Sequence, residues 1–231
     1  MELTDARVLV AGASGALGGQ ITDALLARGA RVVAAGRDAD RVGAVAARCG
    51  TEPVLFDAVD TESCQATVTA AVEQLGGLDV LVVCVGVAGF GRAAEADDAV
   101  VEELFAVNVL GPMALVRAAS AAMGDQGAVA VVSAILADLP TAGMAEYSAA
   151  KSALATWLGV LRREERRRLT VLDVRPPHLD TGLDGRALAG EPPKLPAPFP
   201  SADVVEALVQ GLAEGSREVV LDAKAGALVR R

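Results

Sequence analysis

The residues with the clearest chemical potential in this 231-residue sequence are Tyr147 and Lys151, the only tyrosine and one of three lysines. Placed four residues apart, they would share one face of a helix, which brings a phenol and an ammonium group together. A nearby cation favours the phenolate and lowers the pKa of a tyrosine, as general acid–base chemistry requires. The same spacing also occurs in surface pairs, so a second signal is needed before it indicates catalysis.

That second signal lies near the N-terminus, where Gly12, Gly15 and Gly18 connect an apolar run to a segment of helical spacing. Glycines permit a tight turn, close approach of backbone N–H groups to a pyrophosphate, and close packing of helix on sheet. The following helix would face the phosphates with its positive end. The pattern predicts a dinucleotide site, with a plain strand–helix turn as the alternative. Ser14 would either donate to a phosphate or cap the helix.

The end of the second apolar run distinguishes the two nicotinamide dinucleotides. An acidic residue there would bind the ribose 2′-hydroxyl of NAD, whereas an arginine would accept the 2′-phosphate of NADP. Residues 34–36 carry no acid, and they are followed by Arg37, whose planar guanidinium matches phosphate oxygens. We therefore predict NADP as the cofactor. The alternative is that Arg37 is a surface cation paired with Asp38 or Asp40.

Short apolar runs alternate with longer Ala-rich segments of helical spacing along most of the chain. The predicted strands are Arg7–Val10, Arg31–Ala35, Pro53–Phe56, Leu78–Val83, Ala128–Val132, Thr170–Val174 and Glu218–Leu221. The predicted helices are Ala16–Arg28, Asp38–Cys49, Thr61–Leu75, Asp97–Ala122, Tyr147–Arg167 and Ser201–Glu214. Near-continuous Val and Leu runs suit strands buried on both faces. The alternation predicts an α/β fold, a Rossmann-like doubly wound parallel sheet of about seven strands with helices on both faces, in a single domain over residues 1–231.

The segment Arg175–Pro200 interrupts this pattern, because it holds seven of the ten prolines. Proline lacks an N–H and fixes φ, so the segment is neither an interior helix nor a central strand. A loop of this length inside a compact domain is typically an active-site cover or a disordered segment. We predict a substrate cover at about 176–200. His178, the only histidine, would bond to cofactor or substrate, or fix its own turn.

Composition excludes several classes of protein. The formal net charge of −9 argues against a nucleic-acid surface or a binder of anionic membranes. No 18-residue uncharged apolar run suggests a membrane span, and the first seven residues lack the layout of a signal peptide. Three cysteines without C-x-x-C spacing argue against a disulfide framework or a metal site. We therefore expect a cytoplasmic protein that binds no metal.

Together, these motifs resemble the short-chain dehydrogenase/reductase family over nearly the whole chain. The family's glycine loop corresponds to Ala11–Gly18, its catalytic Asn to Asn108, and its Y-x-x-x-K motif to residues 147–151. Asp57 looks like the family's adenine-binding Asp. The resemblance implies cofactor contacts at Gly12, Ser14, Gly15, Leu17, Gly18, Arg37, Asp57, Ala58, Gly86, Tyr147, Lys151, Pro177 and Thr181.

The resemblance also implies a reaction. NADPH would deliver hydride to a small or medium hydrophobic ketone or aldehyde, while Tyr147 gives a proton to the carbonyl oxygen. Lys151 would hold the nicotinamide ribose and depress the Tyr147 pKa, and Asn108 would anchor a water that relays protons to Lys151. Phe90, Met144 and Leu183 would line the substrate pocket or belong to the core. Family members pair through the helices corresponding to Asp97–Ala122 and Tyr147–Arg167, which implies a homodimer or homotetramer.

Three departures from the family pattern matter. Ala16 stands where the family's second loop glycine is usual. Cys84 replaces an Asn before Gly86 and would be a small buried apolar group or a reactive thiol. Ala134 occupies the usual position of the catalytic Ser, thirteen residues before the Tyr, and Ser133 lies one place earlier.

Strand side chains alternate faces, so Ser133 is expected to point away from the cleft unless the strand has ended or bulged there. Tyr147, Lys151 and Asn108 together with Arg37 predict an NADPH-dependent carbonyl reductase or alcohol dehydrogenase. Ala134 and the irregular glycine spacing favour the alternative, a catalytically silent NADP(H)-binding sensor or scaffold. The loop spacing alone suggests a third class, an epimerase or dehydratase that uses its cofactor transiently.

Overall fold

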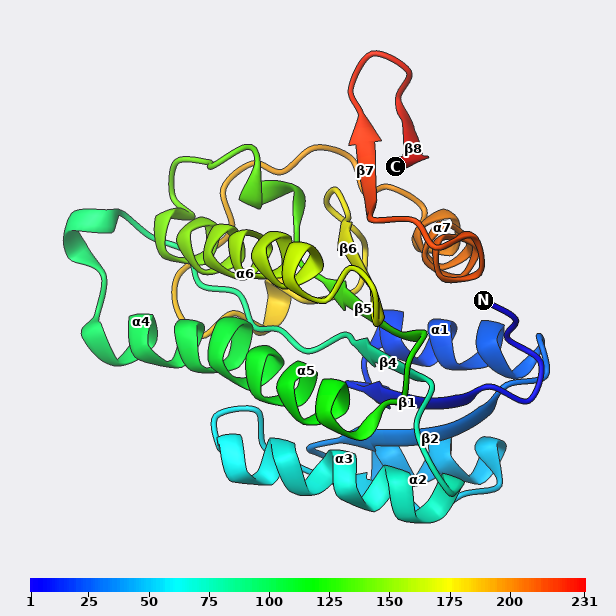
Figure 1. Cartoon of the computed structure of the whole chain (residues 1–231). Coiled ribbons are helices and arrows are strands. Elements are labelled where there is room, and N and C mark those ends of the chain that lie inside the picture. Colours follow the sequence, from blue (N-terminus) through cyan, green and yellow to red (C-terminus); the bar gives the residue numbers. More distant parts are fainter.

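Strands and helices alternate throughout the computed structural model, which describes residues 1–231. The strands are β1 (Arg7–Ala11), β2 (Arg31–Gly36), β3 (Val54–Leu55), β4 (Val80–Val83), β5 (Gly127–Val132), β6 (Leu169–Arg175), β7 (Glu218–Asp222) and β8 (Ala227–Arg230). They form one sheet in the order β3-β2-β1-β4-β5-β6-β7-β8 (Figure 1). The order reverses between β1 and β4, and ligands of such sheets bind beyond the carboxyl ends of the strands at this point.

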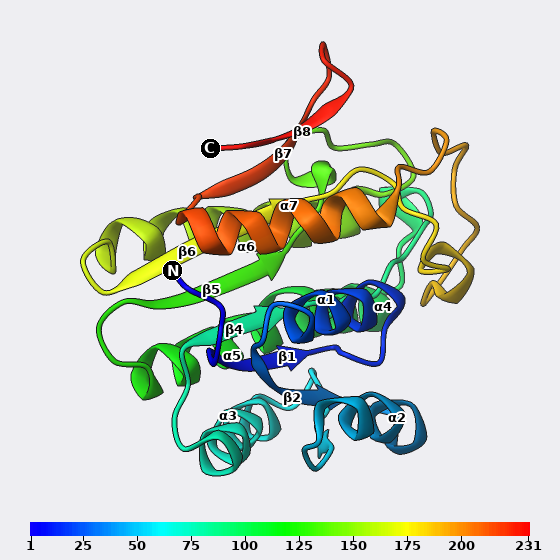
Figure 2. The same ribbon diagram turned by 90° about the vertical axis from the view of Figure 1, so that its right-hand side faces the viewer.

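Helices cover both faces of the sheet, as the apolar strands require. Figure 2 shows α1 (Ala16–Leu26) and α7 (Ser201–Glu214) in front of the sheet, and α2 (Ala39–Cys49) belongs to the same face. The opposite face carries α3 (Thr61–Leu75), α5 (Gly111–Ala122) and α6 (Ala145–Glu164). Each face encloses its own core cluster of 26 buried residues. Alternate residues of the five central strands β2, β1, β4, β5 and β6 enter opposite clusters, which confirms the predicted doubly wound fold.

The sheet has one strand that the sequence did not indicate. Strand β8 pairs with β7 in antiparallel fashion, whereas every other neighbouring pair is parallel. The turn between them is closed by Asp222, whose carboxylate accepts from the backbone N–H groups of Lys224 and Ala225, and by Gly226 at φ +63°. A four-residue edge strand with only two half-buried side chains carries too little hydrophobic pattern to be recognised.

The predicted long helix Asp97–Ala122 is divided into three parts. Helix α4 (Asp98–Phe105) continues through a π-helical turn, Ala106–Leu110, into α5. The 25-residue helix is long and apolar enough to cross a membrane by length and composition, but half of its most apolar stretch is buried within the fold. π-Turns inside helices are frequent at functional sites, and this one contains Asn108.

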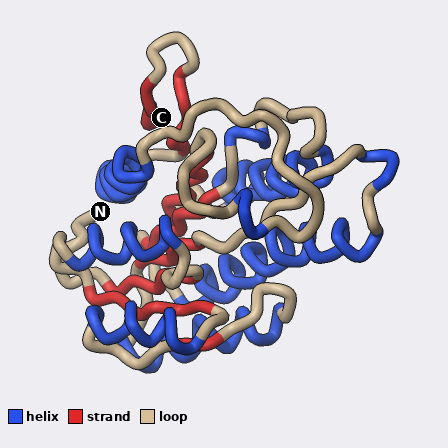
Figure 3. The backbone as a smooth tube through the Cα atoms, turned by 180° about the vertical axis from the view of Figure 1, so that it is seen from behind, coloured by secondary structure: helices blue, strands red, loops and turns tan.

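The Pro-rich segment 176–200 packs across the carboxyl ends of the strands, where Figure 3 shows it as a long loop. Its regular structure is a single 3₁₀ turn, Asp184–Arg186, and an isolated bridge between Leu179 and Phe199. Backbone hydrogen bonds tie it to the segment after β4, because Leu188 N–H donates to Ala88 and Phe90 N–H donates to Ala189. The segment is therefore held in place by backbone contacts.

Candidate active site

The glycine loop folds so tightly against the chain's own backbone that Gly12 and Gly18 leave no room for a side chain. Gly12 has φ +88°, and a Cβ there would lie 2.7 Å from the carbonyl oxygen of Cys84. A Cβ on Gly18 would overlap the carbonyl oxygen of Gly12. Gly15 is the N-cap of α1 and no side chain caps the helix. The Ser14 hydroxyl makes no hydrogen bond within the chain, so the structure does not support its predicted alternative role as a cap.

The end of β2 presents an unpaired arginine. Arg37 is exposed and makes no ion pair, because Asp38 instead caps α2 by accepting from Arg41 N–H at 3.0 Å. The pairing of Arg37 with Asp38 or Asp40, which the sequence left open, is therefore absent. The Arg41 guanidinium donates to the carbonyl oxygen of Ser14 at 2.7 Å and so braces the glycine loop from outside. No local pattern of the sequence indicates this role of Arg41, because the two residues lie 27 positions apart.

Asp57 and Ala58 lie on the loop after β3. The Asp57 carboxylate accepts from Val59 N–H at 3.2 Å, and its backbone N–H donates to Ser63. These contacts order the loop next to the glycine loop's strand, since β3 pairs with β2 and β2 pairs with β1. Asp57 is exposed, so its other carboxylate oxygen can meet a ligand.

Tyr147 and Lys151 face one another on α6, as their spacing predicts. Both side chains are buried, and Lys151 Nζ lies 5.8 Å from the centroid of the Tyr147 ring. Nζ also donates to the carbonyl oxygen of Val132 at 3.4 Å. Burial lowers the pKa of Lys151 to about 8, against the attraction of Asp173 and Cys84.

The predicted lowering of the Tyr147 pKa does not occur in this structure. Burial raises the pKa of Tyr147 to about 12, because the phenolate would lose its solvation. The ammonium of Lys151 lies over the ring, and its attraction does not offset that cost. Tyr147 is thus a buried, protonated phenol at neutral pH.

Asn108 connects the π-turn to the segment after β4. Its side chain is fully buried, donates to the carbonyl oxygens of Val87 at 2.9 Å and Leu104 at 3.0 Å, and accepts from Val87 N–H at 3.3 Å. A Cβ on Gly86 would lie 3.1 Å from the Asn108 carbonyl oxygen and 3.4 Å from Lys151 Nζ. Asn108, Gly86 and Lys151 therefore meet at one point.

Burial raises the pKa of Cys84 to about 12, which favours an apolar thiol over a reactive thiolate.

Ser133 follows the last residue of β5 and points at the neighbouring strand. Its hydroxyl donates to the buried carboxylate of Asp173 on β6, and its backbone N–H donates to Val174 at 2.8 Å. The only proton of the hydroxyl is therefore held by a carboxylate. Ser133 and Ala134 both line the pocket described below, so the predicted catalytic role of Ser133 stays a prediction.

Replacement of Ser133 by alanine will distinguish a structural role, as the donor to Asp173, from a catalytic role as the donor to a substrate carbonyl. We expect the free energy of unfolding to fall by about 1–3 kcal/mol, because Asp173 would lose a buried donor. We expect kcat/KM to change less than about tenfold, because the lost proton did not reach the substrate; a loss of about 10²–10³ would show a carbonyl-polarising donor. Denaturant unfolding and steady-state kinetics measure both, with Ser201→Ala as the control, since that hydroxyl donates to Gln20 at 3.0 Å and neither residue lines the pocket.

One pocket of about 410 Å³ runs from the glycine loop to the Pro-rich segment. Tyr147 and Lys151 line it between these ends. At the substrate end His178 Nδ1 lies 2.9 Å from the carbonyl oxygen of Pro196, which fits the interpretation that it fixes its own loop. Predicted site residues that line the pocket are Gly15, Leu17, Gly18, Gly86, Ser133, Tyr147, Lys151, Pro177 and Thr181. Those outside its lining are Gly12, Ser14, Arg37, Asp57, Ala58 and Asn108. The candidate substrate-lining residues Phe90, Met144 and Leu183 also face it.

A doubly wound sheet with a glycine loop, a buried Tyr–Lys pair and a pocket joining them defines a dinucleotide-dependent oxidoreductase. The family described as short chain dehydrogenase matches residues 6–191. The chain is 30% identical over 222 residues to the cyclic-di-GMP-binding biofilm dispersal mediator protein of Escherichia coli, covering 94% of this chain and 86% of that protein.

Solved structures of short-chain dehydrogenases have the same fold as this chain. A short chain dehydrogenase from Burkholderia cenocepacia in complex with NADP has a TM-score of 0.81 and 27% identity, with 92% of each chain covered. A short chain dehydrogenase/reductase from Burkholderia phymatum in complex with NAD has a TM-score of 0.85 at 19% identity, covering 94% of this chain and 89% of that one. The chain belongs to the short-chain dehydrogenase family and is an NAD(P)-dependent oxidoreductase.

Proposed function

We propose that the protein reduces small or medium hydrophobic ketones or aldehydes with NADPH. The observation that carries the proposal is the position of Tyr147 and Lys151 between the glycine loop and an apolar pocket end in one continuous pocket. The apolar end is formed by Phe90, Leu136 and Met144, together with side chains of the Pro-rich cover. A carbonyl compound bound there would present its oxygen to the phenol of Tyr147, and its hydrocarbon part would be buried against the apolar lining.

The cradle fits a nicotinamide dinucleotide, because the N-terminus of α1 at Gly15 lines the pocket and no side chain caps it. Gly12 and Gly18 permit the tight turn at this end of the helix, where a Cβ would meet the chain's own backbone. Bound there, the cofactor supplies hydride. The chain's own residues orient the reactants and manage the proton. Tyr147, with its pKa raised to about 12, carries the proton that a carbonyl oxygen needs during reduction. Lys151 would bind the ribose hydroxyls, and Asn108 holds the segment after β4 against Lys151.

Turnover with a panel of carbonyl compounds tests this proposal. We expect consumption of NADPH with aliphatic and aryl ketones, followed by its near-ultraviolet absorbance. Calorimetric binding of NADPH without turnover across a broad panel would overturn it in favour of a binding protein. Two observations support a binding protein as the second candidate function. The Ser133 hydroxyl donates its proton to Asp173, and the Escherichia coli relative is named as a protein that binds cyclic-di-GMP.

NADP preference is the second part of the proposal, supported by the unpaired Arg37 at the end of β2. We expect Arg37→Gln to raise the Kd of NADPH about 10- to 100-fold, as the loss of charge-assisted hydrogen bonds to a phosphate implies. The Kd of NADH should stay unchanged, because NADH lacks that phosphate. Arg48→Gln on the following helix, α2, is the control, since Arg48 pairs with Asp23 at 3.0 Å. Equal weakening of both dinucleotides would contradict the assignment.

We further propose a cytoplasmic homodimer or homotetramer. Leu110 and Val160 are apolar side chains exposed by 52% and 38% on the two helical segments that the family uses for pairing. Burial of these side chains against a second copy would remove apolar surface from water. Light scattering that reports a monomer would contradict the proposal.

A further inference from the structure

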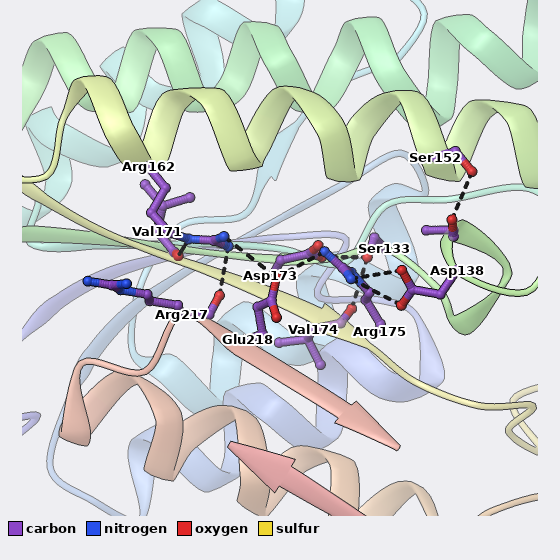
Figure 4. Close-up of polar contacts among 11 residues, drawn as sticks. Ser133, Asp138, Ser152, Arg162, Val171, Asp173, Val174, Arg175, Arg217 and Glu218 are labelled. Atoms are coloured by element: carbon purple, nitrogen blue, oxygen red, sulfur yellow. Dashed lines mark hydrogen bonds and ion pairs between the residues drawn. The ribbon is translucent and has the colours of Figure 1, made fainter. Parts of the chain in front are cut away.

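A buried polar cluster lies behind the pocket, on the side away from the substrate. Its centre is Arg175, at the last position of β6, whose side chain is only 15% exposed (Figure 4). Arg175 Nε donates to Asp173 at 2.7 Å, and Asp173 is completely buried. The other carboxylate oxygen of Asp173 accepts from the Ser133 hydroxyl. A charged residue inside a strand is costly, and here the cost is offset by full pairing.

The same guanidinium also reaches the far end of the pocket wall. Its terminal nitrogen Nη1 donates to both carboxylate oxygens of Asp138 at 3.0 Å each. Nη2 donates to Glu218 on β7 at 3.2 Å. Arg175 therefore makes charged contacts with three carboxylates from three segments of the chain. Only the planar fork of an arginine has this reach, because a lysine offers a single nitrogen.

Ser133 and Asp138 bracket a six-residue segment, residues 133–138, which we name the pocket wall. Within it, Ala134, Ile135 and Leu136 line the pocket. The wall contains one 3₁₀ turn, Ile135–Ala137, and Ile135 N–H donates to the carbonyl oxygen of Pro176 at 2.9 Å. Its two ends are thus joined to one guanidinium, through Asp173 at the first end and through Asp138 at the second.

The pocket wall and the Tyr–Lys pair share one contact but differ in what holds the ends of the wall. Helix α6 carries Tyr147 and Lys151 and touches the middle of the wall, where Ser152 donates to the carbonyl oxygen of Ala137 at 3.1 Å. The two ends of the wall are held by Arg175 on β6, through Asp173 and Asp138. The side chain of Arg175 bonds only to Asp173, Asp138 and Glu218, so a change there removes no hydrogen bond of α6 or of the glycine loop. We therefore expect such a change to loosen the ends of the wall and alter substrate fit while α6 keeps the proton donor in place.

We propose that Arg175 is a specificity-determining positioning residue that fixes the pocket wall through Asp173 and Asp138 and so sets the width of the substrate end. The proposal rests on the proposed carbonyl reductase function. It predicts that loosening the wall changes the choice between substrates of different width, while NADPH binding is retained. A role confined to overall stability would lower activity toward all substrates equally.

Arg175→Lys and Asp138→Asn test the proposal. Asp138 is half exposed, so its variant removes one contact of Arg175 at little risk to folding. With butanone and 2-tetralone as narrow and wide probes, we expect Arg175→Lys to change the ratio of the two kcat/KM values about tenfold, through KM. The Kd of NADPH and kcat for butanone should stay within about twofold. Asp138→Asn should change the ratio in the same direction by less, and the double variant should equal Arg175→Lys alone.

Hydrogen exchange provides a readout that does not need turnover. We expect faster exchange at the amides of residues 135–139 in Arg175→Lys and Asp138→Asn, with the glycine loop unchanged. Arg230→Lys is the matched control, because Arg230 pairs with Glu214 at 2.9 Å outside the pocket. An unchanged kcat/KM ratio, or unchanged exchange of the wall, would overturn the proposal. Wild-type protein that reduces no ketone would overturn the proposed function instead, and exchange alone would then decide whether Arg175 fixes the wall.

Discussion

Replacement of Tyr147 by phenylalanine will lower kcat for ketone reduction about 10²–10⁴-fold, the range that a general acid contributes. The phenyl ring keeps the packing of Tyr147 on α6. It also keeps the contact of the ring with Lys151, whose Nζ lies 5.8 Å from the ring centroid. Only the proton donor is lost. Steady-state kinetics and calorimetry together measure the result, which is loss of turnover with an unchanged Kd of NADPH.

The single tyrosine gives this prediction a direct control. Because Tyr147 is the only tyrosine, ultraviolet titration of tyrosinate in the wild-type protein reports this group alone. We expect ionisation near the value of about 12 to which burial raises its pKa. Phenylalanine removes the titration. Turnover of Tyr147→Phe within tenfold of wild type would show that another group protonates the carbonyl oxygen.

Gly18→Ala will abolish measurable NADPH binding, with a rise in Kd of at least about 100-fold. A Cβ at this position would overlap the carbonyl oxygen of Gly12, which is backbone and cannot rotate away. Relief requires α1 to move from the glycine loop, and such overpacking typically costs about 1–3 kcal/mol of stability. The loss of binding follows because the loop amides and the helix N-terminus no longer converge.

Gly43→Ala is the matched control for this substitution. Gly43 lies within α2, and a Cβ there would meet nothing within 4 Å. Alanine should therefore stabilise the helix by about 0.5–1 kcal/mol and leave the Kd of NADPH unchanged. Calorimetry and thermal unfolding measure both variants. Wild-type affinity in Gly18→Ala would contradict a phosphate site at this loop.

The local patterns of the sequence were sufficient for the architecture. Glycine spacing after β1 and the Val-rich strands predicted the doubly wound sheet, because buried parallel strands admit few other residues. The Tyr147–Lys151 pair was equally predictable, since residues four apart share a helix face whatever surrounds them. Strand β8 was not predicted, because a short edge strand is half exposed to solvent and its hydrophobic periodicity is weak.

The pKa values and hydrogen-bond partners of individual side chains depended on neighbours far away in the sequence. The direction of the Tyr147 pKa shift was wrongly predicted from its helix alone, because burial by distant segments outweighs one nearby cation. Ser133 could be placed in the strand register, but its partner Asp173 lies 40 residues away. A polar residue within the apolar strand β6 was the signal that a buried partner must exist.

By itself, the sequence determined the seven parallel strands, the helices between them and the helix face that carries Tyr147 and Lys151, because those properties depend on local periodicity and backbone geometry. Only the tertiary structure decided which proton is available, which carboxylate holds Ser133, and which arginine spans the pocket wall from Ser133 to Asp138. These properties depend on desolvation and on charge pairs between strands that meet only when the sheet is complete.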